Sequence, residues 1–133
     1  MKQFVTIDTD VLIDFQRGDE VAAFELAQLA RTATLTISTI VQLELLAGSA
    51  NKDILQSSQR LMRRFQVLPL TPEIGEKALV LVTTYSLSNG LRLADAIIAA
   101  TAIEHGLPLI SKNQKDFRFL NKAGLQLLPY PTA

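Results

Sequence analysis

The chain has 133 residues, of which 48% are hydrophobic, with 13 basic and 13 acidic side chains, one histidine and no cysteine. This length predicts a single domain, residues 1–133, that buries roughly two thirds of its unfolded surface. The balanced charge excludes a strong overall attraction to nucleic acid, and the lack of cysteine excludes disulfides and thiolate metal sites. Because no signal peptide or apolar run of about 20 residues is present, we expect a cytoplasmic protein without a membrane span.

Strand-like and helix-like segments alternate along the chain. The predicted strands, which are short and apolar, are residues 4–8, 34–38, 66–70, 107–111 and 125–129. The predicted helices are residues 10–17, 19–33, 40–47, 53–65, 72–88 and 92–106. Strands that alternate with helices favour right-handed crossovers and a mainly parallel sheet covered by helices on both faces. The sequence therefore predicts an α/β protein whose ligands bind at the carboxyl ends of the strands, near a switch in strand order.

Several helix starts carry recognisable capping residues. Asp10 can cap the helix that precedes Gly18, and Thr39 with Gln42 has the spacing of a capping box. Thr71 followed by a proline marks another start.

Four acids fall at strand ends or early in helices. Asp8 ends the first strand, Glu44 lies in the helix after the second, Asp95 lies in the first turn of an apolar helix, and Asp116 follows the strand 107–111. Taken singly, such acids serve as caps, helix-dipole partners or surface residues. Together at one sheet edge they would repel each other and raise one another's pKa values. A divalent cation removes that conflict, and oxygen-only ligands favour Mg²⁺ or Mn²⁺.

The chemistry that follows from such a site is metal-assisted hydrolysis, in which the ion activates water and stabilises charge on a phosphoryl oxygen. The only histidine, His105, falls at the end of its helix and is expected to be a helix-terminal residue. A mechanism with two histidines is therefore excluded. The sequence also has no GxSxG elbow, Walker loop or dinucleotide-binding fingerprint.

Three blocks, "IDTDVLIDFQRG", "ISTIVQLELLAG" and "LRLADAIIAATAIEHGLPLISKNQKDF", resemble the ordered motifs of PIN-domain ribonucleases. The small size and the "LELLAG" block resemble the VapC-type toxins of toxin–antitoxin modules. The blocks cover residues 7–117, which is most of the chain. The resemblance implies a three-layer α/β/α sandwich and a Mg²⁺- or Mn²⁺-dependent endoribonuclease. It further implies a homodimer and a small antitoxin partner, a segment of which occupies a groove near the site.

The resemblance assigns roles to individual acids. It implies that Asp8, Glu44 and Asp95 are catalytic metal ligands and that Asp10 supports Asp8. For the fourth position it leaves Asp116 as a ligand or Asn113 as a neutral contact.

RNA binding needs local cations, because the net charge is zero. The candidates for RNA contacts are Arg60, Arg63, Arg64, Arg92 and Lys112.

Three other functions share features with this sequence. The segment "IDTDVLID" is close to the motif of haloacid-dehalogenase phosphatases, but Leu12 departs from that motif and its late paired acids are missing. A phosphoreceiver domain would need an aspartate at the end of the strand 66–70, where none is present. A PIN fold that binds RNA or protein without cleavage is the third, although such a scaffold has no physical need for a costly acid cluster.

Overall fold

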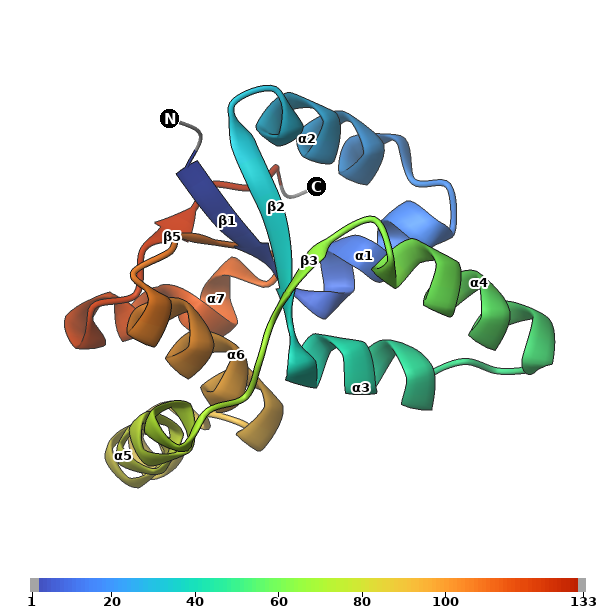
Figure 1. The fold of residues 1–133 in the computed structure, drawn as a ribbon. Coiled ribbons are helices and arrows are strands. Elements are labelled where there is room, and N and C mark those ends of the chain that lie inside the picture. Colours follow the sequence, from blue (N-terminus) through green and yellow to red (C-terminus); the bar gives the residue numbers. More distant parts are fainter. Residues whose placement is uncertain (1–2, 132–133) are drawn as a thin grey trace.

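The computed structural model describes residues 3–131 and contains one five-stranded parallel sheet in the order β3-β2-β1-β4-β5 (Figure 1). The strands are β1 (Gln3–Ile7), β2 (Ala33–Ser38), β3 (Gln66–Leu68), β4 (Leu109–Ile110) and β5 (Leu127–Leu128). The α-helices are α1 (Thr9–Gln16), α2 (Glu20–Ala30), α3 (Thr39–Ala47), α4 (Lys52–Met62), α5 (Pro72–Asn89), α6 (Leu93–His105) and α7 (Gln114–Phe117). A 3₁₀ helix, η1 (Arg118–Ala123), follows α7.

The helices cover both faces of the sheet, which confirms the predicted α/β/α sandwich. Helices α1 and α2 lie on one side of the strands, and α5 and α6 pack together on the other (Figure 1). The apolar side chains between these layers form one core, whose fully buried members include Ile7, Leu12, Ile37, Ile98 and Phe117. The alternation of strand-like and helix-like segments in the sequence therefore predicted correctly that helices cover both faces of the sheet.

Strand β1 is the centre of the sheet, and it pairs with β2 on one side and with β4 on the other. The chain leaves β1 toward β2 and β3, whereas it leaves β4 toward β5 on the opposite edge. The order of connection therefore reverses between β1 and β4. In parallel sheets the crevice beside the carboxyl ends of such a strand pair is the usual place for a ligand.

Two predicted helix caps are wrong by one or two residues. Asp8, not Asp10, is the N-cap of α1, because its carboxylate accepts the backbone N–H of Thr9. Ser38, not Thr39, is the N-cap of α3, and its hydroxyl accepts the N–H of Val41 at 3.4 Å. In both cases the helix begins directly after the strand, so the cap is the last strand residue, Ser38, or the residue that follows the strand, Asp8.

The segment after β4 also differs from the prediction. It contains α7 and η1, which the sequence pattern did not indicate. Phe117, the last residue of α7, is completely buried and fixes the segment against the core. Within residues 3–131, no helix is both long and apolar enough to cross a membrane.

Two glycines test the helix geometry. Gly106 follows the end of α6 in the left-handed conformation, with φ +65°. Gly75 lies inside α5. At either position an added Cβ would meet no atom within 4 Å, so neither substitution is limited by space. Gly106→Ala should lower the free energy of unfolding by about 1 kcal/mol, because alanine is strained at positive φ. Gly75→Ala should raise it by about 0.5–1 kcal/mol, because alanine loses less backbone entropy in a helix. Urea denaturation of both variants measures this, and a destabilised Gly75→Ala protein would contradict the assignment of α5.

Candidate active site

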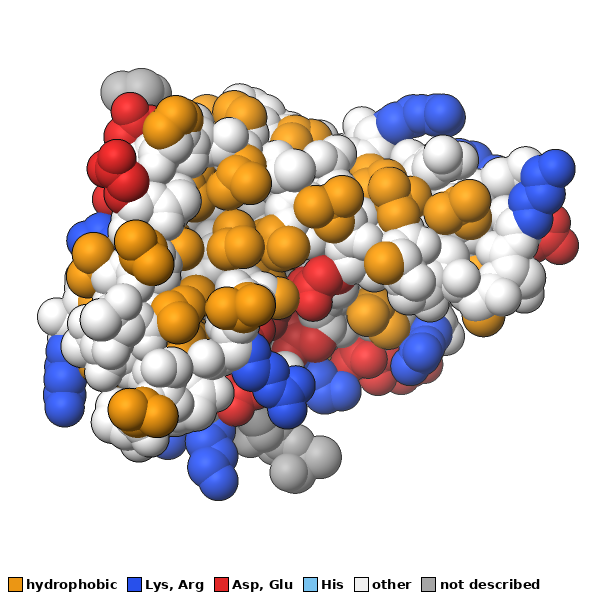
Figure 2. All heavy atoms as spheres, turned by 90° about the horizontal axis from the view of Figure 1, so that it is seen from below, with side chains coloured by type: hydrophobic (Ala, Val, Ile, Leu, Met, Phe, Trp, Pro, Cys, Tyr) orange, Lys and Arg blue, Asp and Glu red, His pale blue; other side chains and the backbone are white. Residues whose placement is uncertain are grey.

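The candidate site lies at the carboxyl ends of β1 and β4, where the connections of the sheet diverge. Asp8 directly follows β1 and Ser111 directly follows β4. Figure 2 looks onto this edge of the molecule, and acidic side chains gather near its middle with lysine and arginine side chains beside them.

Asp8 is the most buried acid of the site, with 4% of its surface exposed. Its Oδ1 accepts the N–H of Thr9 at 2.8 Å, and its Oδ2 accepts the hydroxyl of Ser111 at 2.7 Å. Burial and the charge of Asp10 raise the pKa of Asp8 from 3.8 to about 8, although both hydrogen bonds act in the opposite direction. The carboxylate is therefore held firmly in place but is costly to ionise without a cation.

Asp10 connects the start of α1 to the loop after β4. Its carboxylate accepts the backbone N–H groups of Asn113 at 3.1 Å and Lys112 at 3.4 Å, and the Ser111 hydroxyl lies 3.5 Å from its Oδ2. Burial raises the pKa of Asp10 as well. Asp10 therefore contacts the same serine that holds Asp8.

Glu44 approaches the site from α3 and is half-buried. The hydroxyl of Thr9 donates a 2.6 Å hydrogen bond to its Oε1. Thr9 therefore binds Asp8 through its backbone and Glu44 through its side chain, and links these two acids.

Asp95 lies in the first turn of α6 and is also half-buried. Its pKa is raised to about 6, mainly by burial and then by the charges of Asp116 and Glu44, while Arg92 opposes the shift. Acids from three separate helices therefore share one electrostatic neighbourhood. This is the mutual repulsion that the sequence predicted for acids at a common sheet edge.

Asp116 is exposed and lies on α7. Asn113 caps that helix and contacts the site through its backbone N–H, which donates to Asp10 and to the Ser111 hydroxyl at 3.0 Å. Of the two residues expected to fill the fourth position, Asp116 is therefore the one that brings a negative charge to Asp95.

The acids lie around the site but are too far apart to form a preformed metal site. Within residues 3–131, no three acid or histidine side chains stand close enough to form a ready-made metal site. The chemistry of the donor set nevertheless fits a hard divalent cation, because all donors are carboxylate oxygens. The raised pKa values of Asp8 and Asp95 fit it also, because a cation would offset the repulsion that raises them.

The expected RNA-contact cations are scattered. Arg60 and Arg64 line a pocket beside Phe15 that includes none of the four acids, and the Arg64 guanidinium lies 5.3 Å from the Phe15 ring centre. Arg63 is exposed at the end of α4.

The remaining two candidates lie nearer the acids. Lys112 is paired with Asp14 at 2.9 Å, and Arg92 is close enough to Asp95 to lower its pKa. His105 ends α6, ten residues from Asp95, which corresponds to about 15 Å along a helix.

Two polar residues of the site, Thr9 and Ser111, were missed in the sequence. Ser111 ends the predicted strand 107–111, so the rule that ligands lie at strand ends would have indicated it. Nothing in the sequence pattern distinguished Thr9, because its role depends on how α1 and α3 face each other.

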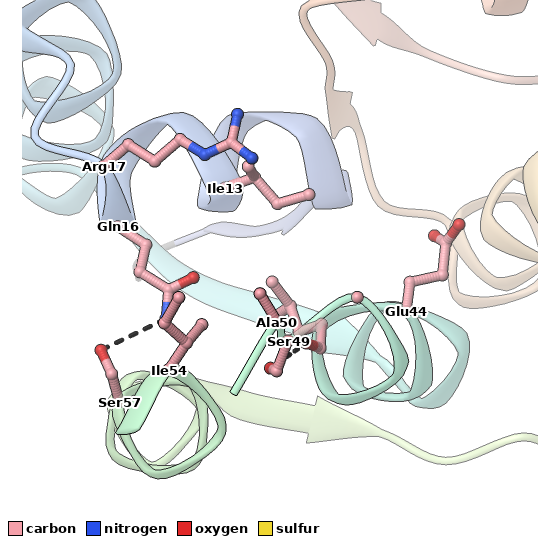
Figure 3. A pocket seen from close by; sticks show the side chains of 10 residues that line it. Ile13, Gln16, Arg17, Glu44, Ser49, Ala50, Ile54 and Ser57 are labelled. Atoms are coloured by element: carbon pink, nitrogen blue, oxygen red, sulfur yellow. Dashed lines mark hydrogen bonds between the residues drawn. The ribbon is translucent and has the colours of Figure 1, made fainter. Parts of the chain in front are cut away.

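A pocket of about 250 Å³ lies beside the site, between α1, α3 and α4 (Figure 3). Glu44 stands at one end, and Gln16 with Ser57 at the other, while Ile13 and Ile54 supply apolar walls. The amide of Gln16 donates to the Ser57 hydroxyl at 3.2 Å, which connects α1 to α4.

Comparisons with known proteins agree on one family. Residues 5–123 match the PIN domain. The chain is 32% identical over 130 residues to Ribonuclease VapC1 of Rickettsia felis, which covers 92% of each chain.

Solved structures give the same result. A toxin–antitoxin complex from Klebsiella pneumoniae contains a chain with 29% identity and a TM-score of 0.77, covering 94% of this chain and 96% of that one. VapBC2 from Rickettsia felis, bound to a DNA fragment from its promoter, matches with a TM-score of 0.80 at 20% identity, over 97% and 100% of the two chains. The latter likeness concerns the fold alone.

The metal-free protein should lose stability as pH rises. The unfolded chain releases the Asp8 proton near pH 3.8, whereas the folded protein keeps it until about pH 8, so the unfolded state binds fewer protons between these values. The free energy of unfolding should therefore fall from about pH 4 to pH 8, with a smaller contribution from Asp95 up to about pH 6. Urea denaturation in EDTA measures this, and Asp8→Asn should flatten the dependence. An unchanged slope in that variant would contradict the burial of an ionisable group at this position.

Proposed function

Because the chain belongs to the PIN-domain family and is a VapC-type member of it, we propose that it is a Mg²⁺- or Mn²⁺-dependent endoribonuclease. We further propose that it is the toxin of a toxin–antitoxin pair. The observation that carries the proposal is the group of acids at the divergence of β1 and β4, three of which, Asp8, Asp10 and Asp95, have raised pKa values. The names of its relatives, a ribonuclease and a toxin–antitoxin complex, support it.

The carboxylates of Asp8, Glu44, Asp95 and Asp116 would hold the cation. When bound, a divalent cation activates a water molecule and stabilises charge on the phosphoryl oxygens of the scissile phosphodiester. The chain's own residues fix the geometry: Ser111 orients Asp8, and Thr9 orients Glu44. Since Asp8 and Asp95 must lose their protons to bind a cation, affinity for the metal should increase with pH.

The phosphatase and phosphoreceiver alternatives have no support from the comparisons, which match the PIN domain over residues 5–123. The binding-module alternative remains and is distinguished by activity. A non-catalytic protein would bind RNA without any metal-dependent cleavage.

Cleavage should require both the cation and the acids. Asp95→Asn should lower the rate on a mixed pool of structured RNAs by about 100-fold or more with Mg²⁺ or Mn²⁺, because it removes a carboxylate that would hold the cation. EDTA should have the same effect on the unmodified protein. Gel analysis of partner-free protein measures this, and full activity of Asp95→Asn would refute the assigned site.

Two controls separate catalysis from folding and from histidine chemistry. His105→Gln should cleave at the normal rate, because this residue lies at the far end of α6. Mn²⁺ should raise the melting temperature of the unmodified protein at pH 8 but have little effect on that of Asp95→Asn, because only a bound ligand stabilises the fold. This readout does not depend on finding the correct RNA.

For the antitoxin we propose that a segment of it occupies the pocket between α1, α3 and α4. Its apolar walls and its position beside Glu44 would let that segment block the acids. Ile54→Glu should weaken antitoxin binding at least tenfold, because it places a charge on an apolar wall, and should leave cleavage unchanged. Calorimetry with the candidate antitoxin peptide tests it, with Val21→Glu on α2 as the control. Equal affinities of the two variants would place the antitoxin elsewhere.

For the homodimer we propose the face formed by exposed apolar side chains of α3, α5 and the start of α6. They are Leu43, Leu79, Val80, Leu87 and Leu93. Leu87 is fully exposed, an unfavourable position for leucine unless a partner covers it. Figure 2 shows hydrophobic side chains spread over the surface next to the acids.

The dimer can be tested by introducing charge into that face. The combined variant Val80→Glu and Leu87→Glu should be monomeric in size-exclusion chromatography with light scattering, because two buried carboxylates would repel their copies in the partner. Phe24→Glu, on α2, should keep the mass of the unmodified protein. A dimeric double variant would exclude α5 from the interface.

A further inference from the structure

A second pocket, distinct from the one between α1, α3 and α4, opens on the other side of the acids. Its volume is about 390 Å³, and Asn89, Lys115, Asp116, Arg118 and Phe119 line it. It therefore lies between the end of α5 and the α7–η1 segment. Asp116 belongs to both features, since it lines this pocket and is also the charge that acts most strongly on Asp95. The pocket thus adjoins the proposed catalytic acids.

The cations of this pocket are free, in contrast to those expected from the sequence. Lys115 and Arg118 are exposed, and neither forms an ion pair with any of the residues 3–131. Lys112, by comparison, is neutralised by Asp14. Lys115 and Arg118 are three residues apart on consecutive helical turns, so they lie on the same side of the segment. Two free cations at such spacing favour an anion such as a phosphodiester.

The other walls fit a nucleobase. The Phe119 ring is half-buried and packs at 5.4 Å, tilted by 51°, on the ring of Tyr85, so it is held in a fixed orientation. Exposed aromatic surface of this kind stacks with bases of single-stranded nucleic acid. The hydroxyl of Ser88 donates to Oδ1 of Asn89 at 2.7 Å, which leaves the amide N–H groups of Asn89 as donors to a base edge.

We propose that this pocket binds one nucleotide of single-stranded RNA next to the cleaved bond. Lys115 and Arg118 contact its phosphate, and Phe119 contacts its base. The inference deepens the proposed ribonuclease function and names positioning residues for the substrate. The nearest rival occupant, an acidic or phosphorylated peptide, would use the cations but would not need the aromatic wall beside the acids.

The test is binding of a labelled 12-nucleotide single-stranded RNA of mixed sequence, measured by fluorescence anisotropy in EDTA so that no cleavage occurs. The combined variant Lys115→Gln and Arg118→Gln should bind at least tenfold more weakly at low salt. The slope of log K against log salt should be shallower by about 0.7, because the variant no longer neutralises the one phosphate that both cations contact. Lys122→Gln is the control, because it removes one positive charge on η1 outside the pocket. It should change neither the affinity for the RNA nor the salt dependence. Equal behaviour of the two proteins, or no binding by the unmodified protein, would overturn the proposal.

The base contact has its own readout. Phe119→Leu should weaken binding of the intact strand about tenfold but leave binding of an abasic strand of equal length unchanged. Equal losses on both strands would mean that Phe119 only supports the fold, and would overturn its assignment.

Failure of this subsite and failure of the proposed function are distinguishable. Normal cleavage by the Lys115 and Arg118 variant would remove the subsite alone, whereas RNA binding through the pocket without metal-dependent cleavage would remove the nuclease function alone.

Discussion

The burial of the Asp8 carboxylate at the end of β1 is the constraint on which the rest of the site depends. A buried carboxylate is costly unless its oxygens are satisfied, and here a backbone N–H and the Ser111 hydroxyl satisfy them. Neither donor carries a positive charge, so the ionised form stays unfavourable and the pKa rises to about 8. The fold therefore positions the Asp8 carboxylate through hydrogen bonds but supplies no positive charge to stabilise its ionised form, which a bound cation would do.

The neighbours of Asp8 extend this arrangement to three helices and one loop. Thr9 ties Glu44 to the same corner, and Asp10 fastens the loop after β4 by accepting two of its backbone N–H groups. Asp95 then faces the negative charges of Asp116 and Glu44 without an ion pair of its own among residues 3–131. Such a cluster lowers stability in the absence of a cation, and the continuous apolar core offsets that cost.

The surfaces around the acids have different characters, which suits different partners. The pocket beside Glu44 is enclosed by three helices and partly apolar, whereas the pocket beside Asp116 carries free cations and an aromatic ring. Exposed leucine and valine side chains of α5 form a third surface. One sheet edge thus brings the pocket proposed for the antitoxin, the pocket proposed for RNA and an apolar face together around the same carboxylates.

The sequence by itself determined the alternation of strands and helices, the parallel α/β/α fold, and the placement of Asp8 after β1, Glu44 in the helix after β2 and Asp95 in the first turn of α6. These features follow from local periodicity and from the geometry of parallel sheets, so they can be read from one chain. Only the tertiary structure decided that Asp8 rather than Asp10 caps α1, and that Ser111 and Thr9 hold the acids. It also decided that Lys115 and Arg118 lie beside Asp116 while Arg60 and Arg64 lie beside Phe15. Such contacts join residues far apart in sequence, and their geometry depends on how the packed layers meet rather than on any local pattern.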